Sequence, residues 1–222
     1  MDKVNVLEAL ANVEQPFTLV QVARVGGLAM YAYVCQGAVQ FHRHIDHDEL
    51  FLVRQGWMML ESEWGNLTLK PDEMVIVPKG VGHRSGSQLR AVVLLVQPAA
   101  LADRKNGHRH LFAIPRENAL NKFDLMGVAA RATSLCPEPV ADMEELTAQV
   151  VAGKGISPLF ANALSESLWL VLRGQARIEA EGEKLDLYSG DLVVIGRDRS
   201  HRLTGSANMV TCLLSRWAEC AP

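Results

Sequence analysis

The chain has 222 residues, of which 49% are hydrophobic and 21% are charged, and its formal net charge at pH 7 is -3. This length and composition allow a sizeable core in one or two domains. The small net charge excludes the strong attraction to nucleic acid or to an anionic membrane surface that a markedly basic protein has.

No targeting or membrane-spanning segment is predicted. Residues 1–5 lack a basic region followed by a long apolar stretch, and apolar runs such as residues 91–96 are far shorter than a bilayer span. The four cysteines are scattered and form no Cys-x-x-Cys pair, which favours reduced thiols over a disulfide framework or a zinc ribbon. These features predict a cytoplasmic location.

The first half of the chain has the pattern of an all-β protein. Apolar residues at helical spacing predict a short amphipathic helix before Pro16: Val4, Leu7, Leu10 and Ala11. Two β-rich runs, residues 18–25 and 28–35, are joined at a Gly-Gly pair that is typical of a hairpin. Further short runs follow, separated by turn residues: residues 39–44, 50–53, 58–63, 67–69, 74–77 and 91–96. Such a series predicts a sandwich or barrel.

Two of these runs carry residues at metal-ligand spacing. His42 and His44 alternate, so on a strand both imidazoles leave the same face, and Glu49 opens the next apolar run. Downstream, residues 78–83 have the form Pro-x-Gly-x-x-His, in which a tight turn precedes His83. Three imidazoles and one carboxylate could therefore converge on one metal ion.

The two stretches resemble the motifs of the cupin superfamily. The first motif is His-x-His, three or four residues, Glu, six residues and Gly, and the second is Pro-x-Gly-x-x-His. The resemblance implies a small antiparallel β-barrel that holds one divalent metal through His42, His44, Glu49 and His83. Three departures from the family's pattern lie outside the ligand positions: Gly37, Asp72 and Ser87.

Neighbouring side chains would line a mostly apolar pocket. Phe51 and Val53 share the inward face of the carboxylate ligand, and Gln40 shares the face of the first two histidines. The residues between the ligands are interpreted as a charged loop at the barrel mouth: Asp46, His47 and Asp48. A direct role in binding metal or substrate is the alternative.

The β pattern weakens after residue 97. A second His-x-His, formed by His108 and His110, has neither a following glutamate at the right spacing nor a Pro-x-Gly-x-x-His, so we interpret it as part of a solvated linker, with a metal site as the alternative. Apolar residues at helical spacing then predict an amphipathic helix packed outside a barrel and ending near residues 153–155: Val140, Met143, Leu146 and Val150.

An internal repeat links the two halves of the chain. Residues 50–56 reappear as residues 168–174, a shift of 118, and the same shift carries His83 to His201 without a gap. Two copies of one barrel explain this economically. The resemblance thus extends to two-barrel cupins, or bicupins, with tandem double-stranded β-helix (jelly-roll) barrels and a few short helices. The predicted domains are a barrel with the metal site at 1–98, a linker at 99–137 and a second barrel at 138–222.

The second copy lacks most of the ligands. Phe160, Asn162 and Ser167 stand at the positions of the first three, and only His201 keeps its identity. One imidazole is a poor divalent site, because zinc sites use three or four protein ligands. We therefore predict a degenerate barrel without metal, in which His201 is a hydrogen-bonded pocket or core residue; contact with a ligand is the alternative.

Three classes of function remain open. Three imidazoles and a carboxylate suit Fe, Mn, Ni, Co, Cu or Zn as divalent ions, and ligand type alone leaves the choice open. The resemblance implies a metal-dependent dioxygenase, isomerase or cyclase acting on a small organic molecule. The alternative is a non-catalytic module that binds or senses a sugar or carboxylate, because no acid, base or nucleophile is evident beyond the ligands. A storage or structural role ranks last. The resemblance also implies a homodimer.

Overall fold

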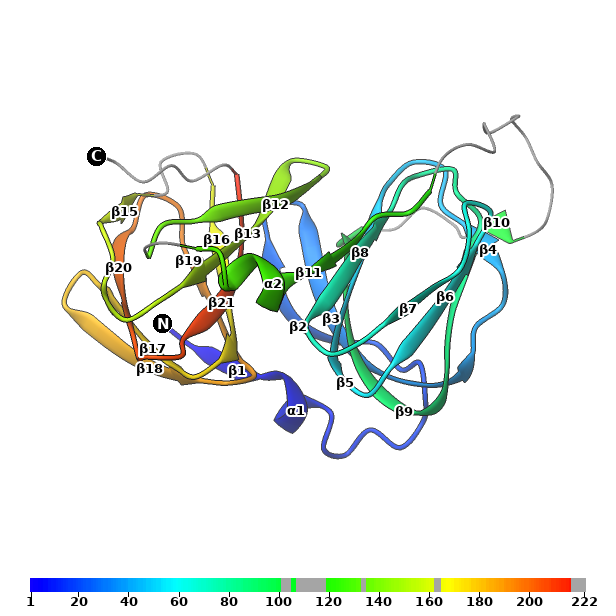
Figure 1. Cartoon of the computed structure of the whole chain (residues 1–222), viewed down its shortest axis with the longest axis horizontal. Helices are drawn as coiled ribbons and strands as arrows, with labels where there is room; N and C mark the ends of the chain where they lie inside the picture. Colours follow the sequence, from blue (N-terminus) through cyan, green and yellow to red (C-terminus); the bar gives the residue numbers. More distant parts are fainter. Residues whose placement is uncertain (101–104, 107–118, 133–134, 162–164, 217–222) are drawn as a thin grey trace. The chain divides into compact units, whose positions relative to one another are not determined.

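The computed structural model describes residues 1–100, 105–106, 119–132, 135–161 and 165–216 (Figure 1). Almost all regular structure there is β-strand; the two helices are α1 (Val6–Ala9) and α2 (Leu125–Ala129). The predicted all-β class is therefore confirmed. The chain forms two units: an N-terminal unit of Leu10–Gln21 and Gly27–Phe123, and a C-terminal unit of Met1–Ala9, Val22–Gly26 and Asp124–Pro222.

The N-terminal unit is organised around one long strand, β9, which pairs in antiparallel fashion with β3, β4, β5 and β6. A core of inward-facing apolar side chains, Phe51, Val53, Leu60 and Val93 among them, fills the unit. Its strands and the preceding hairpin strand are β2 (Val20–Val25), β3 (Leu28–Ala38), β4 (His42–Arg43), β5 (Glu49–Gln55), β6 (Met58–Ser62), β7 (Leu67–Leu69), β8 (Glu73–Val77), β9 (His83–Pro98), β10 (Lys105–Asn106) and β11 (Lys122–Asp124).

The C-terminal unit contains two sheets, in the orders β1-β19-β16-β21-β13-β12 and β14-β20-β17-β18, with β15 paired to β20. Its core includes Trp169, Ile178 and Leu203. The strands are β1 (Lys3–Asn5), β12 (Glu138–Met143), β13 (Leu146–Ala152), β14 (Gly155–Ile156), β15 (Phe160–Ala161), β16 (Ser167–Arg173), β17 (Gln175–Ala180), β18 (Glu183–Tyr188), β19 (Asp191–Ile195), β20 (Ser200–Gly205) and β21 (Val210–Ser215).

The sequence repeat is a repeat of strands. β4, β5 and β8 have counterparts with the same shift of 118 residues in β15, β16 and β19. The glycine that follows β5 and the one that follows β16 occupy equivalent turns and meet the same constraints. Gly56 has φ +74° and Gly174 has φ +76°, and a Cβ at either would lie 2.8 Å from a backbone oxygen, that of Arg90 or Asn208. Only glycine fits both the conformation and the space.

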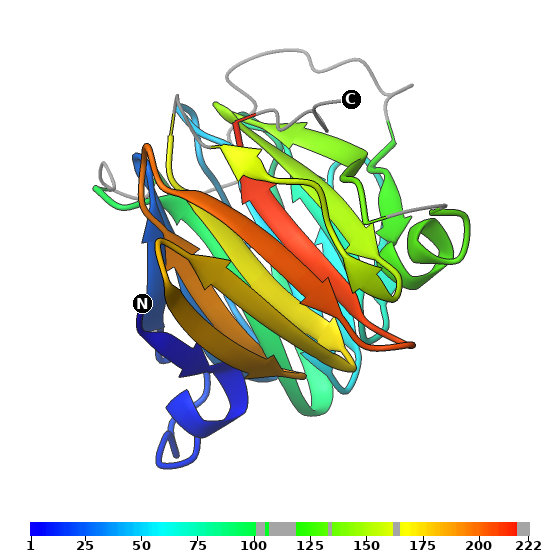
Figure 2. The same ribbon diagram turned by 90° about the vertical axis from the view of Figure 1, so that its left-hand side faces the viewer.

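A short strand precedes the main strands of each half of the chain: β1 comes before those of the N-terminal unit but belongs to the C-terminal unit, and β11 comes before most of the C-terminal unit but ends the sheet of the N-terminal unit. β1 pairs with β19, with Lys3 opposite Val193, and β11 lies next to β8 at the end of the other sheet. Figure 2, which faces the C-terminal unit, shows β1 in blue at the edge of the orange strands. Each of these strands is followed by one of the short helices, so the repeat begins earlier than the motif-based comparison indicates.

Two predicted helices differ from the structure. The helix predicted from Val140 to Val150 is wrong: this segment forms β12 and β13, joined at Glu144, whose φ is +52°. Leu146, Ala148 and Val150 lie on one face of β13 and the polar Thr147 and Gln149 on the other, and both faces are buried. The helical spacing of the apolar residues therefore comes from two strands and not from one helix. The N-terminal helix is shorter than predicted because Asn5, whose side chain accepts hydrogen bonds from the backbone N–H groups of Leu7 and Glu8, starts it only at Val6.

The cysteines described by the structure are of two kinds, free and disulfide-bonded. Cys35 and Cys212 are free and buried, and burial raises the pKa of Cys35 to about 12, which keeps it protonated and inert. Cys136 is disulfide-bonded, so the expectation of reduced thiols is wrong for this residue. Within the described residues, no helix has the length and apolar character needed to cross a bilayer.

Candidate metal centre

Strand pairing brings the two predicted motifs together. His42 on β4 lies directly opposite His83 on β9 in an antiparallel ladder, so both side chains leave the same face of the sheet. His44 follows two residues after His42 and returns to that face, while Glu49 is the first residue of β5, which also pairs with β9. The alternation predicted from the sequence therefore produces one cluster.

The four side chains meet in the interior. One ligand atom from each of His42, His44, Glu49 and His83 lies within 4.8 Å of the other three. The residues are between 1% and 6% exposed. Glu49 Oε2 is 2.8 Å from His83 Nε2 and 3.2 Å from His44 Nε2, so the carboxylate stands between two imidazoles. These separations are those of atoms that can share one ion.

Backbone carbonyls orient two of the imidazoles. His42 Nδ1 lies 2.8 Å from the carbonyl oxygen of Gln40, and His83 Nδ1 lies 3.1 Å from that of Val81. A carbonyl oxygen can only accept, so Nδ1 carries the proton in both rings and Nε2 keeps its lone pair. The side chain of Gln40, predicted to line the pocket, is exposed, and its backbone is what contacts the cluster.

Three of the buried atoms that could bind a metal lack hydrogen-bond partners, which buried polar atoms normally have. His44 Nε2, His83 Nε2 and Glu49 Oε2 have no hydrogen-bond partner, although they lie close to one another. An unprotonated imidazole nitrogen beside a carboxylate oxygen is a contact between two electron-rich atoms, which is unfavourable unless a cation lies between them. The donor set of three imidazoles and one carboxylate therefore fits a divalent transition metal.

Glu49 is held in its charged form. Burial alone would raise the pKa of Glu49, but hydrogen bonding and positive charge at His44 and His83, a role that a bound cation takes over when both Nε2 atoms are unprotonated, more than offset this effect and keep the pKa well below its ordinary range. The carboxylate is therefore ionised at neutral pH, as a metal ligand must be.

The surroundings of the cluster are apolar on one side and contain a further histidine on the other. Phe51 and Val53 lie in the buried core, and the Phe51 ring stands edge-on at 5.9 Å from that of His83. His47 is buried, with its ring 4.4 Å from that of His44 and its Nδ1 2.8 Å from Asp46 Oδ1. The expectation of a charged loop is therefore wrong for His47, and alternation gave no signal of its burial.

The equivalent place in the C-terminal unit is filled by aromatic rings. Phe160 lies opposite His201, as His42 lies opposite His83. The indole N–H of Trp169 approaches His201 Nε2 at 3.0 Å and the Ser167 hydroxyl oxygen at 3.2 Å. His201 Nδ1 lies 3.3 Å from the Arg199 carbonyl oxygen, so both of its ring nitrogens have partners. Among the described residues of this unit, no group of three potential metal ligands comes together.

Within the described ranges, the four-residue cluster is the one group of three or more potential metal ligands. The second His-x-His, at His108 and His110, lies outside the described residues, as does Asn162.

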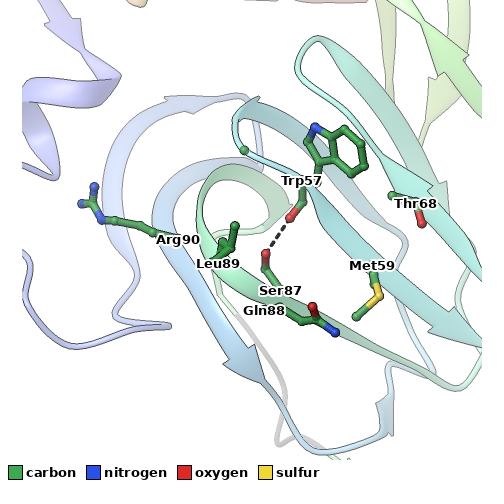
Figure 3. A pocket seen from close by; sticks show the side chains of 8 residues that line it. Trp57, Met59, Thr68, Ser87, Gln88, Leu89 and Arg90 are labelled. Atoms are coloured by element: carbon green, nitrogen blue, oxygen red, sulfur yellow. Dashed lines mark hydrogen bonds between the residues drawn. The ribbon is translucent and has the colours of Figure 1, made fainter.

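An exposed groove of about 580 Å³ lies elsewhere on the N-terminal unit (Figure 3). Trp57, Met59 and Leu89 line it and are 60%, 42% and 79% exposed. The Ser87 hydroxyl donates a hydrogen bond of 2.7 Å to the Trp57 carbonyl oxygen beside it. The lining contains no carboxylate, imidazole or thiol, so the groove offers no site for a transition metal.

Comparison with known proteins extends this description. Residues 2–92 match the family described as the N-terminal part of homogentisate 1,2-dioxygenase. The uncharacterised protein YdbB of Bacillus subtilis (strain 168) is 31% identical over 99 residues, which are 44% of this chain and 88% of that protein.

Solved structures share the fold over nearly the whole chain. A cupin 2 conserved barrel domain protein from Leptotrichia buccalis superposes with a TM-score of 0.72 at 10% identity, covering 97% of this chain and 96% of its own. Salicylate 1,2-dioxygenase from Pseudaminobacter salicylatoxidans superposes with a TM-score of 0.74 at 9% identity, covering 97% and 83%. At these identities the likeness shows the fold alone.

Proposed function

Because this chain belongs to the cupin superfamily, we propose that its N-terminal unit is a metal-dependent enzyme of the dioxygenase, isomerase or cyclase type, acting on a small organic molecule. One divalent transition metal would be held by His42, His44, Glu49 and His83. The observation that carries the proposal is the convergence of four buried donor groups, three of which have atoms without hydrogen-bond partners.

The chain's own residues have distinct tasks in this proposal. When bound, the ion would act as a Lewis acid or redox centre. His42 and His83 are aimed by the carbonyl oxygens of Gln40 and Val81, and Glu49 contributes the negative charge. Phe51 and Val53 form an apolar wall, which would exclude water and strengthen electrostatic interactions at the site.

Among the three reaction types, oxygenation of a small aromatic acid has the most support. The family match to a homogentisate dioxygenase domain and the fold likeness to a salicylate dioxygenase both favour it. This support comes from the relatives, because function depends on the site and one fold serves many reactions.

The test is purification without oxygen, elemental analysis, and a screen of oxygen consumption and product formation with catechols, hydroxylated aromatic acids, diketones and keto sugars. We expect about one ion per chain, as one site predicts, and turnover with at least one substrate class. A preparation that binds no divalent metal at all under these conditions would sink the proposal.

The second candidate is a binding or sensor module for a sugar or carboxylate. It is favoured because the imidazole and carboxylate groups that meet at the cluster, among the described residues, are the four donors themselves, with His47 beside His44. Stoichiometric ligand binding without turnover, with each of the six metals in turn, would establish this alternative in place of the enzyme.

We further propose that the C-terminal unit is a degenerate barrel that holds no metal, supported by the paired nitrogens of His201. A cytoplasmic location remains the prediction drawn from the scattered cysteines. On the family resemblance, we propose a homodimer. Mass measurement by light scattering tests it, and a monomer at micromolar concentration would refute it.

A further inference from the structure

An ion pair between the buried Arg43 and the partly buried Glu63 links the two segments that carry the proposed metal ligands. Resting on the proposed metal site, we propose that Arg43 and Glu63 are positioning residues that hold His42, His44 and His83 in the geometry the ion requires. Neither side chain is part of the ligand cluster, and neither was singled out by motif or spacing.

Arg43 connects the first motif to the second. It lies between the two histidines of β4 and, by alternation, faces away from them. Its side chain is only 5% exposed; Nη2 lies 2.6 Å from Glu63 Oε1, and Nη1 donates to the carbonyl oxygen of Gly80 at 3.4 Å. The Gly80 N–H in turn donates to the His44 carbonyl oxygen at 2.6 Å.

Glu63 completes the connection to His83. Its second carboxylate oxygen, Oε2, accepts a hydrogen bond of 2.9 Å from the Gly82 N–H, and its own N–H donates to the Gly82 carbonyl oxygen at 3.0 Å. Gly82 is the residue immediately before His83. The chain of contacts therefore runs from the residue between two ligands to the residue beside a third, through one carboxylate.

The packing at Gly82 leaves little freedom. A Cβ there would lie 2.6 Å from the Phe41 ring and 2.9 Å from the Glu63 carboxyl carbon. The glycine thus allows the turn before His83 to press directly against the residue that precedes His42 and against Glu63. A displacement of Glu63 would therefore shift Gly82 and, with it, the position of His83.

Energetics favour a positioning role over a stabilising one. Burying two charges costs desolvation free energy that their attraction often only repays, so an apolar pair of similar size would stabilise the fold about as well. The ion pair also fixes the positions of the two segments, because a guanidinium and a carboxylate set the geometry of several hydrogen bonds at once.

The C-terminal unit serves as an internal comparison. Ala161 stands at the position of Arg43, Ser200 at that of Gly82, and Glu181 at that of Glu63. Glu181 instead pairs at 2.9 Å with Arg199, with 59% of its side chain exposed. The unit without the ligand set thus also lacks a counterpart of the Arg43–Glu63 ion pair, as expected if that ion pair positions metal ligands.

The experiment measures Co²⁺ binding to the full-length chain by chelator competition and by the visible absorption of the bound ion, which reports its geometry. Glu63→Gln should weaken the affinity about ten-fold or more, as loss of groups that orient ligands does elsewhere, and should alter the spectrum. The matched control is Glu61→Gln. Glu61 lies on β6, two residues before Glu63, and this substitution breaks an exposed ion pair with Arg84. Its affinity should stay within about two-fold, because exposed pairs contribute little.

A second variant separates positioning from folding. Arg43→Met combined with Glu63→Leu removes both charges and leaves none uncompensated, so the metal-free chain should melt near the unaltered protein while Co²⁺ affinity still falls about ten-fold or more. Unchanged affinity and spectrum in this folded double variant would overturn the positioning role alone. Failure of the unaltered chain to bind any divalent metal would overturn the proposed function, and this inference with it.

Discussion

The indole N–H of Trp169 lies 3.0 Å from His201 Nε2, the nitrogen whose counterpart in the N-terminal unit, His83 Nε2, has no hydrogen-bond partner. The two barrels therefore use the same histidine position in opposite ways. One imidazole is held by a ring that fills the interior, while the other is left with a lone pair directed at a carboxylate and two further imidazoles.

Trp169→Phe should destabilise the C-terminal unit by about 1–3 kcal/mol, because it leaves the buried acceptor on His201 without a donor. The measurement is the midpoint of urea or thermal unfolding followed by circular dichroism. Trp57→Phe is the matched control, since Trp57 is 60% exposed, and its midpoint should hardly move. Equal midpoints for both variants would show that the Trp169 hydrogen bond contributes nothing.

His201 should make stability depend on pH. Burial lowers the pKa of His201 below its ordinary value, with a partial offset from the Arg199 carbonyl oxygen. The unfolded chain then binds more protons than the folded chain at mildly acid pH, so stability rises with pH there. This contribution is complete above about pH 6.5 and is lost as the pH falls through the folded pKa.

In His201→Gln, the fall in melting temperature between about pH 7.5 and about pH 5.5 should be smaller than in the unaltered chain, both measured with a chelator present. The difference between the two proteins isolates His201 from other titrating groups. An identical fall in both would contradict the assigned direction.

Metal retention should separate the two barrels. His42→Ala and Glu49→Gln each remove one of four ligands and should abolish retention of the ion through dialysis, whereas His201→Ala should retain it at the level of the unaltered chain. Elemental analysis after gel filtration makes the comparison on folded protein. Equal loss in all three variants would contradict the assignment of the C-terminal unit as a barrel that holds no metal.

Two glycines of the C-terminal unit separate backbone strain from steric clash. At Gly182, φ is +84° and a Cβ would meet nothing within 4 Å, so Gly182→Ala should cost only the about 1–2 kcal/mol of a left-handed conformation. At Gly174, φ is +76° and a Cβ would also lie 2.8 Å from the Asn208 carbonyl oxygen. Gly174→Ala should therefore cost about 1–3 kcal/mol more. Unfolding curves that show equal losses would refute the clash.

Strand alternation explains how much of the site could be predicted. His42 and His44 were assigned to one face because a strand repeats every two residues, whereas Glu49 and His83 joined the ligand set through the resemblance to the cupin motifs; the strand register places His83 opposite His42. The barrel class could be predicted for the same reason, from short apolar runs between turn residues.

The remainder depends on contacts that no local pattern encodes. Arg43 looks like a surface residue until Glu63, twenty positions later, is seen to bury it. The apolar residues of β12 and β13 together fall at helical spacing, and the burial of both faces of β13 cannot be read from the sequence. β1 has only three residues, and its strand conformation comes from its partner.

The pairing of Lys3–Asn5 with Asp191–Val193 also orders events during synthesis. At ribosomal rates of about 5–20 residues per second, β1 emerges roughly ten to forty seconds before the strand it joins. β1 must therefore remain unpaired while the N-terminal unit is synthesised and folds. Closure of the C-terminal unit waits until Asp191–Val193 has been translated, and a nascent chain halted before that point would display an unpaired β1.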